Sequence, residues 1–370
     1  MNTGIGIAAL APQHIRAIAP YPPGKPITAL AREMGLPVDS IVKLASNENP
    51  LGMSPKALAA TQAALGGLSR YPDQYELIQA LAERHGLDMV QIALGNGSND
   101  LLDCVARVFL GPGRSAVFSR HAFAVYPLAT QATGAECIEV AARAGDYGHD
   151  LEAMLLAIRP DTRIVWIANP NNPTGTFLSH AQLRVFLEAL PPHVVAVLDE
   201  AYNEYLPPAL ASEGATLSWL SEFPNLLITR TFSKVYGLAG LRIGYGMASA
   251  EIIDLMNRVR QPFNVNNLAL VAARAALDDH LFLAESFELN QRGLEQIVAG
   301  LKRLGLGHIP AHGNFVAFHV ADAAGVNQRL LKQGVIVRPL ANYAMPDHLR
   351  VTIGLERENT RFLEVLEKSL

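Results

Sequence analysis

The chain has 370 residues, half of them hydrophobic, and a net charge of −4, so it suits two domains and offers no basic face for nucleic acid. Its two cysteines, Cys104 and Cys137, show no disulfide or metal-type spacing, which favours a reducing cytoplasm. The scattered histidines predict no metal site, no stretch reaches the ~18 apolar residues of a membrane span, and the N-terminus lacks the basic lead-in of a signal peptide.

Residues 1–40 are rich in proline and glycine, above all in the segment Tyr21–Pro26, which predicts an extended N-terminal arm. In residues 41–262, short apolar runs alternate with helical patterns. The predicted strands are Ile92–Gly95, Ala116–Ser119, Arg163–Asn169, Val194–Asp199, Leu226–Thr231 and Ile243–Met247. The predicted helices between them are Leu101–Leu110, Leu151–Ile158 and Ala181–Leu190. We therefore predict an α/β fold, a large doubly wound and mostly parallel sheet that binds ligands at the carboxyl ends of its strands.

Residues 263–370 show longer helical patterns and fewer, more separated strands, which predicts a smaller α+β domain. One helical stretch runs from Asn267 to Leu304, and a final helix follows Glu356. The strands expected between them are Phe315–Val320, Val335–Arg338 and Leu349–Ile353.

The strongest chemical signal is a lysine just after the predicted strand Leu226–Thr231. Lys234 lies between hydroxyl-bearing residues, Thr231 and Ser233, and a glycine-punctuated turn, and Arg242 follows eight positions later. A lysine in this setting can lose its proton and condense with an aldehyde. Because hydroxyls and an arginine suit a phosphate monoester, the segment suggests pyridoxal phosphate.

A glycine turn follows the strand Ile92–Gly95. The backbone N–H groups of Ser98 and Asn99 could bind phosphate at the start of the next helix, although an ordinary strand-to-helix turn explains the pattern equally well. The third glycine of the dinucleotide-binding fingerprint is absent.

Two further strand ends carry polar residues. Asn172, in the turn Asn169–Gly175, could direct an amide to a ring oxygen, but asparagine, proline and glycine also favour a plain turn. Asp199 ends an apolar strand, where it could face a cationic pyridine nitrogen or simply start a turn. Tyr202 follows it and could reach the phenolic oxygen of the same ring.

Two arginines, Arg338 and Arg350, flank the segment 339–349 near the C-terminus. Each could be an ordinary solvated side chain. As a pair near the expected cleft, they could also bind an anionic substrate through charge-assisted, bidentate contacts.

Taken together, these motifs resemble the fold-type I, pyridoxal-phosphate-dependent aminotransferases of class II, and among them the histidinol-phosphate aminotransferases. The segments that carry the resemblance are Tyr21–Pro26, Leu44–Gly52, Arg70–Asp73, Asn169–Gly175, Asp199–Tyr202, Thr231–Tyr245 and Leu349–Gly354. It implies that L-histidinol phosphate and 2-oxoglutarate are converted to imidazole acetol phosphate and glutamate, a step of histidine biosynthesis.

The resemblance also implies a role for each matched residue. Lys234 would bind the cofactor and act as the general base, and Asp199 would keep the pyridine nitrogen protonated. Asn172 and Tyr202 would bond to the phenolic oxygen, and Phe123, where relatives often carry tyrosine, would stack on the ring. The residues expected around the cofactor phosphate are Ser98, Asn99, Thr231, Ser233, Arg242 and, in a homodimer with shared sites, the partner subunit's Tyr71. The residues expected to bind the substrate are Tyr21, Asn49, Arg338 and Arg350.

Three other functions remain open from the sequence. An aminotransferase for aromatic amino acids would share every cofactor residue and differ only in the side-chain pocket. A decarboxylase of the same fold that acts on phosphorylated substrates would need the substrate carboxylate to leave perpendicular to the ring, and the sequence does not exclude it. An effector-binding domain of a transcription regulator would need a DNA-binding module, for which the chain has neither room nor basic charge.

Overall fold

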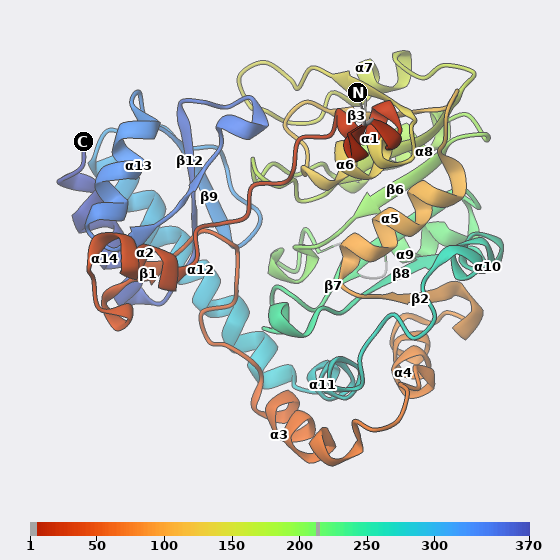
Figure 1. Cartoon of the computed structure of the whole chain (residues 1–370), viewed down its shortest axis with the longest axis horizontal. Coiled ribbons are helices and arrows are strands. Elements are labelled where there is room, and N and C mark those ends of the chain that lie inside the picture. The colour runs from red at the N-terminus through yellow and green to blue at the C-terminus, as the bar shows by residue number, and fades with distance from the viewer. Residues whose placement is uncertain (1–5, 212–214) are drawn as a thin grey trace, which may run out of the picture.

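The computed structural model describes residues 6–211 and 215–370; residues 1–5 of the predicted arm lie outside the described part. Figure 1 shows a larger body built around a central sheet and a smaller body beside it, with the long helix α12 (His280–Arg303) running along the smaller one. This arrangement confirms the predicted fold class, a doubly wound α/β sheet with a smaller α+β part.

The central sheet of the described chain has seven strands in the order β2-β8-β7-β6-β5-β3-β4. Their bounds are β2 Ile92–Gly95, β3 Ser115–Ser119, β4 Glu136–Val140, β5 Thr162–Ala168, β6 Val195–Asp199, β7 Leu226–Thr231 and β8 Gly244–Ala248. Strand β8 runs antiparallel to β2 and β7, and the other pairs are parallel. Strand β4 was not predicted, because it lies at the sheet edge and its partly exposed residues include Glu136 and Glu139, which interrupt any apolar run.

Helices cover both faces of this sheet. One face carries α5 Ser98–Phe109, α6 Val125–Ala132 and α10 Ala250–Val259, and the other carries α3 Pro55–Ala64, α4 Tyr75–His85, α7 Leu151–Leu156, α8 His180–Ala189 and α11 Asn267–Leu277. Along β5, Ile164 and Trp166 pack into the first layer, while Val165 and Ile167 pack into the second. Burial on both faces explains why these strands read as continuous apolar runs.

The smaller body contains an antiparallel sheet in the order β11-β12-β9 and a parallel pair of β1 with β10. Their bounds are β1 Val42–Lys43, β9 Phe315–His319, β10 Val335–Ile336, β11 Arg338–Pro339 and β12 His348–Thr352. Val316, Phe318, Leu349 and Val351 pack into one core with α12, α13 (Ala323–Lys332) and α14 (Glu356–Glu367). Because side chains alternate along a strand, the opposite face of this sheet is left for Arg338 and Arg350.

Two segments depart from the sequence-based expectation. The predicted extended arm contains the helix α2 (Ile27–Met34), whose Leu30 packs with Leu331 and Ile336 of the smaller body. The single helix expected from Asn267 to Leu304 is two helices, because the chain breaks at Asp278–Asp279, where the Asp279 carboxylate accepts hydrogen bonds from Ser54 and the Lys56 N–H. Helix α11, which follows residue 262, packs in the core of the larger body. The domain boundaries at residues 40 and 262 stay a prediction.

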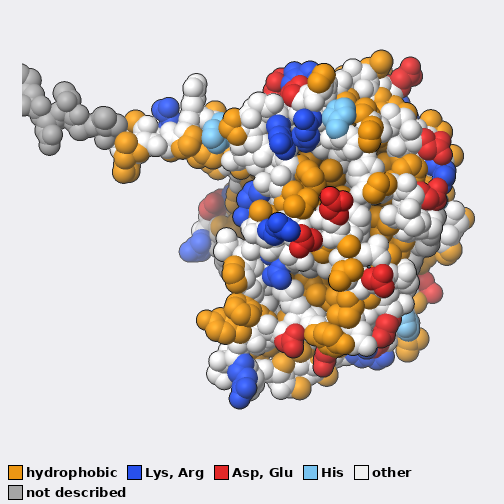
Figure 2. Space-filling view, turned by 90° about the vertical axis from the view of Figure 1, so that its right-hand side faces the viewer, with side chains coloured by type: hydrophobic (Ala, Val, Ile, Leu, Met, Phe, Trp, Pro, Cys, Tyr) orange, Lys and Arg blue, Asp and Glu red, His pale blue; other side chains and the backbone are white. Residues whose placement is uncertain are grey.

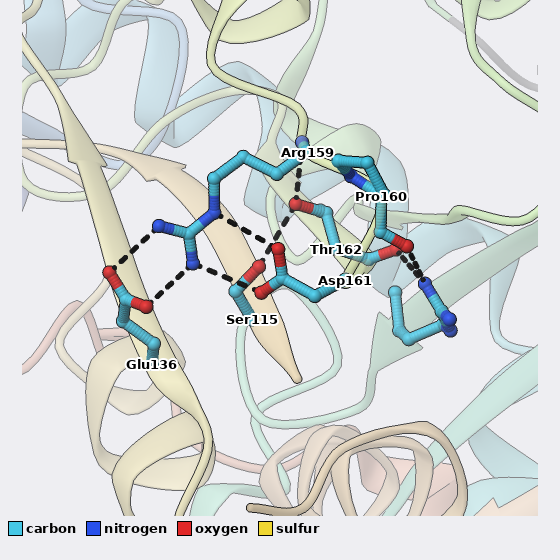
Figure 3. A network of polar contacts seen from close by, with 7 residues as sticks. Ser115, Glu136, Arg159, Pro160, Asp161 and Thr162 are labelled. Atoms are coloured by element: carbon cyan, nitrogen blue, oxygen red, sulfur yellow. Dashed lines mark hydrogen bonds and ion pairs between the residues drawn. The ribbon is translucent and has the colours of Figure 1, made fainter. Parts of the chain in front are cut away.

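Polar side chains tie the N-terminal ends of the parallel strands together (Figure 3). Arg159 donates to both carboxylate oxygens of Glu136 on β4, at 3.0 and 2.6 Å, and to the nearby Asp161. The hydroxyls of Ser115 on β3 and Thr162 on β5 lie 2.9 Å apart. These contacts join β3, β4 and β5 at one end of the sheet, and the opposite, carboxyl ends carry the candidate site.

The described residues also bear on membrane spans, metal sites and surface charge. In residues 6–211 and 215–370, no helix combines the length and the apolar character that crossing a membrane would require. The same segments hold no group of three or more histidine, cysteine, aspartate or glutamate side chains arranged for a metal ion. Positive and negative side chains are interspersed on the face in Figure 2. Cys104 and Cys137 are free thiols, and the cytoplasmic location stays a prediction.

Candidate active site

The predicted cofactor residues gather in one cavity of about 150 Å³ at the carboxyl ends of β5, β6 and β7. Of the predicted cofactor residues, all but Tyr71 line this cavity. The predicted residues that line it are Ser98, Asn99, Phe123, Asn172, Asp199, Tyr202, Thr231, Ser233, Lys234 and Arg242. The topology explains the convergence, since the carboxyl ends of parallel strands meet at one edge of the sheet.

Lys234 lies in the turn after β7, and its Nζ donates to the carbonyl of Ser46 at 3.2 Å. Burial, together with the nearby charge of Arg350, lowers the pKa of its ammonium to about 8. The turn depends on Gly237, which has a φ of +71° and would place a Cβ 1.9 Å from the carbonyl oxygen of Gly52. The fold therefore provides a buried amine that loses its proton far more readily than an exposed lysine.

The helix α5 begins at the cavity with a cradle suited to an anion. Its N-cap is Gly97, whose φ of +84° and lack of a side chain leave the first turn open. A Cβ on Gly97 would lie 2.2 Å from an Arg242 nitrogen, so the glycine allows that guanidinium to approach the helix start. Arg242 also donates to Ser233 Oγ at 3.4 Å. Helix N–H groups, a hydroxyl and a guanidinium form the donor set that a phosphate requires.

Asp199 is buried and both of its oxygens accept hydrogen bonds. The Tyr126 hydroxyl donates to Oδ2 at 3.0 Å and the Thr229 hydroxyl donates to Oδ1 at 3.1 Å. Burial raises the pKa of the carboxyl to about 6, against the lowering effect of the two hydrogen bonds. A cation placed beside this carboxylate would favour its ionised form, which suits a protonated ring nitrogen.

Tyr126 and Thr229 were missed by sequence reasoning, although a signal existed for Thr229. Thr229 is the register partner of Asp199 on the adjacent strand. Tyr126 lies three residues after Phe123, contacts that ring edge-on at 5.8 Å, and stacks on Trp166 at 5.3 Å. Strand pairing could have predicted the threonine, but only the folded helix α6 brings the tyrosine to Asp199.

Asn47 is another missed residue, and it links the smaller body to the cavity. Its side-chain amide donates to the Tyr202 hydroxyl at 2.8 Å, and its Oδ1 accepts from Thr352 on β12 at 3.1 Å. Asn47 belongs to the matched segment Leu44–Gly52, so its presence in that motif was the available signal. This contact holds the phenol of Tyr202 at the cavity wall.

The two arginines lie side by side on the face of the small sheet that is turned away from its helices. They are register partners across β11 and β12. Arg350 donates to Asn172 Oδ1 and to the Ala45 carbonyl, the latter at 2.8 Å, so it contacts a residue of the cavity directly. Arg338 donates to the Tyr21 hydroxyl at 2.6 Å and lies 5.3 Å from the centre of that ring. The structure thus brings three of the predicted substrate residues together beside the cavity.

Asn49 and Tyr71 lie elsewhere. The Asn49 amide nitrogen donates to the Val235 carbonyl and to Ser286 Oγ, at 2.7 and 2.9 Å, and its Oδ1 accepts from Leu51 N–H. These bonds use both amide hydrogens and hold the turn, and a contact of Asn49 with substrate stays a prediction. Tyr71 is 80% exposed and stacks on Phe263 at 4.4 Å.

The chain matches the family model for aminotransferases of class I and II over residues 39–366. It is 68% identical to histidinol-phosphate aminotransferase 1 of Dechloromonas aromatica, over 99% of this chain and 100% of that protein. The corresponding protein of Thiobacillus denitrificans is 60% identical, with coverages of 98% and 94%. A solved histidinol-phosphate aminotransferase from Sinorhizobium meliloti, in complex with pyridoxal-5'-phosphate, superposes with a TM-score of 0.87 at 27% identity, over 98% of this chain and 97% of that one.

A more distant solved structure shares the fold alone. Aspartate aminotransferase from Thermus thermophilus, with maleate, is 23% identical and superposes with a TM-score of 0.83 over 97% of this chain and 99% of that one. The fold is thus common to aminotransferases with different names, so the fold alone does not decide the substrate of this chain. The residues beside the cavity do.

Proposed function

We propose, because the chain belongs to the aminotransferase class I and II family, that it transfers the amino group of L-histidinol phosphate to 2-oxoglutarate with pyridoxal 5'-phosphate as cofactor. The products are imidazole acetol phosphate and glutamate. The observation that supports this most directly is the link from the Lys234 cavity to the paired arginines, through the bond between Arg350 and Asn172. The names of the relatives above support the choice of amino donor.

The cavity residues fit the cofactor, with a matching group for each part of it. Lys234 offers an amine with a lowered pKa for the aldehyde, and the start of α5 with Arg242 offers the phosphate cradle. Asp199 offers a carboxylate for the ring nitrogen. When bound, pyridoxal phosphate supplies the electron sink that makes the substrate Cα–H acidic.

The remaining chemistry belongs to residues of the chain. Lys234 Nζ would hold the cofactor and would take the substrate Cα proton as general base. Asp199, oriented by Tyr126 and Thr229, holds a proton on the ring nitrogen. Asn172 and Tyr202 lie on the cavity wall as hydrogen-bonding partners for the phenolic oxygen.

The two arginines allow one site to serve both halves of the reaction. Histidinol phosphate presents a phosphate, and glutamate and 2-oxoglutarate present carboxylates. Arg338 and Arg350 lie in register on one sheet face and can pair with either anion by bidentate contacts. Arg350 would exchange its bond to Asn172 for one to the substrate.

Competitive turnover with 2-oxoglutarate as acceptor tests the proposed substrate. Histidinol phosphate is expected to exceed phenylalanine and tyrosine in kcat/KM by about a hundredfold or more, because a site built for a charged group discriminates against analogues that lack it. A much higher kcat/KM for phenylalanine would instead establish an aromatic aminotransferase. Release of carbon dioxide from a phosphorylated amino acid, supplied in place of histidinol phosphate, without formation of a keto product would establish a decarboxylase.

We also propose a homodimer in which the partner subunit's Tyr71 completes each phosphate site. The exposure of Tyr71 in the single chain supports this, since the side chain does not line the cavity of its own chain and is open to a partner. Inactive Tyr71→Ala and Lys234→Ala variants, mixed in equal amounts, should recover about a quarter of wild-type activity, because half of the dimers are hybrids with one intact site. Verified hybrid dimers without activity would contradict a shared site.

A further inference from the structure

One face of the small sheet carries more than the two arginines. Arg350 pairs in register with Arg338 on β11 and with Ala317 on β9, so all three side chains share a face. Ala317 carries only a methyl group, and the ring of Tyr343 belongs to the cluster of buried residues packed around it. Tyr343 therefore lies beside the arginines on the face that is turned toward the cavity.

The main chain holds Tyr343 in this position from both bodies. It ends the short helix η8 (Ala341–Tyr343) between β11 and β12, and its N–H donates to the Leu340 carbonyl at 2.9 Å. His121, which precedes the cavity residue Phe123 by two positions, lies with Nδ1 2.7 Å from the Tyr343 carbonyl. Because a carbonyl only accepts, Nδ1 carries the proton and donates it across the two bodies.

Tyr21 and Tyr343 differ in exposure. Tyr21 is 44% exposed and Tyr343 is 4% exposed, so the first phenol is open to solvent and the second is buried. Burial and the neighbouring Tyr21 raise the pKa of Tyr343, while Arg350 and Arg338 lower it, Arg338 also through a side-chain hydrogen bond. The net rise keeps the phenol protonated at neutral pH, so that it can donate.

We propose that Tyr343 is a specificity-determining residue that donates its hydroxyl hydrogen to the phosphate of the amino donor, together with Arg338 and Tyr21. This inference rests on the proposed function. The Tyr21 hydroxyl accepts from Arg338, which leaves its hydrogen for donation to the same anion. A phosphate has three terminal oxygens and can use a guanidinium and two phenols together, whereas a carboxylate has two oxygens. Loss of the Tyr343 hydroxyl should thus weaken phosphate binding more than carboxylate binding.

The test compares Tyr343→Phe with wild type and with Tyr147→Phe, using the cofactor-loaded enzyme. Tyr147 packs in the same cluster, with its ring 5.3 Å from that of His348, so its variant controls for the loss of a phenol there. The measured quantity is the ratio of kcat/KM for histidinol phosphate to that for histidinol, which lacks the phosphate. Tyr343→Phe should lower this ratio by about tenfold or more, and Tyr147→Phe should leave it within about twofold. The KM for glutamate should rise by less than about threefold in either variant.

A second measurement does not depend on the identity of the amino donor. Inorganic phosphate is tested as an inhibitor competitive with glutamate, and its inhibition constant should rise by about tenfold in Tyr343→Phe only. A wild type that prefers histidinol phosphate together with a Tyr343→Phe variant that keeps the full preference would overturn the inference while the proposed function stands. If the wild type shows no preference for the phosphorylated donor, the proposed function fails. In that case the inhibition constants of inorganic phosphate still test Tyr343. Equal inhibition constants in the wild type and in Tyr343→Phe would overturn the role of Tyr343 in phosphate binding.

Discussion

The cofactor cavity and the anion-binding face beside it are assembled in different ways. The cavity collects residues from neighbouring strand ends of one buried sheet, and its central carboxylate, Asp199, is held by two hydrogen bonds from the surrounding core. The anion-binding face collects Tyr21 from the N-terminal segment with Arg338 and Arg350 from the small sheet, and those groups bond to one another or to the cavity wall. The first region is therefore ready for its ligand, whereas the second has to exchange partners when substrate binds.

This difference predicts that variants in the two regions will have different kinetic effects. Changes in the cavity should reduce kcat and cofactor retention, because they remove groups that act on the reacting atoms. Changes on the anion-binding face should act mainly through KM, because they remove binding that ground state and transition state share. The following predictions, in order of expected effect, test that separation.

Lys234→Ala should reduce transamination by about four orders of magnitude or more, since it removes both the covalent anchor and the general base. The visible absorbance of lysine-bound cofactor should disappear, while the far-UV circular dichroism stays that of the wild type. Lys302→Ala, on the exposed C-terminal turn of α12, is the matched control and should behave as wild type. Normal turnover by Lys234→Ala would refute the role of this lysine.

Asp199→Asn should lower kcat by about a thousandfold, because a neutral amide cannot hold a proton on the ring nitrogen. The KM for the amino donor should change by less than about threefold, which single-turnover kinetics together with substrate titration can establish. Asp161→Asn, at the opposite end of the sheet, should leave both constants unchanged. A variant that alters only KM would place Asp199 outside the catalytic machinery.

Arg350→Lys should raise the KM of the amino donor by about a hundredfold, because a lysine cannot reproduce two parallel hydrogen bonds to an anion. Arg350 also donates to Asn172, so its loss should shift the absorbance of the bound cofactor as well. Arg338→Lys should raise KM without that spectral shift, since Arg338 bonds to Tyr21 and Pro22 instead. An identical spectral shift in both variants would contradict the distinction between the two arginines.

The lowered pKa of Lys234, about 8, predicts the pH dependence of cofactor binding by cofactor-free protein. Only the neutral amine attacks an aldehyde, so the rate should rise by about tenfold per pH unit below 8 and level off above it. Stopped-flow absorbance after mixing with pyridoxal phosphate measures this rate. A plateau reached only near pH 10 would mean that burial does not lower the pKa of this amine.

Sequence patterns predicted the cavity far better than the face beside it. The residues predicted to bind the cofactor lie in short motifs at the ends of apolar strands. Because β5, β6 and β7 are parallel neighbours in one sheet, their ends lie together. The edge strand β4 escaped prediction because half-exposed residues carry no apolar run. The bonds of Asn49 to Val235 and Ser286 could not be predicted either, because they join residues that only folding brings together.

The sequence by itself determined the family, the fold class and most of the residues that line the cavity, because motifs and strand periodicity are properties of residues close together in the chain. The tertiary structure alone decided which polar groups support them. Tyr126 and Asn47 reach Asp199 and Tyr202 from segments distant in the chain. Their positions depend on how helices and the two bodies pack, and no short-range pattern specifies a contact that long-range packing creates.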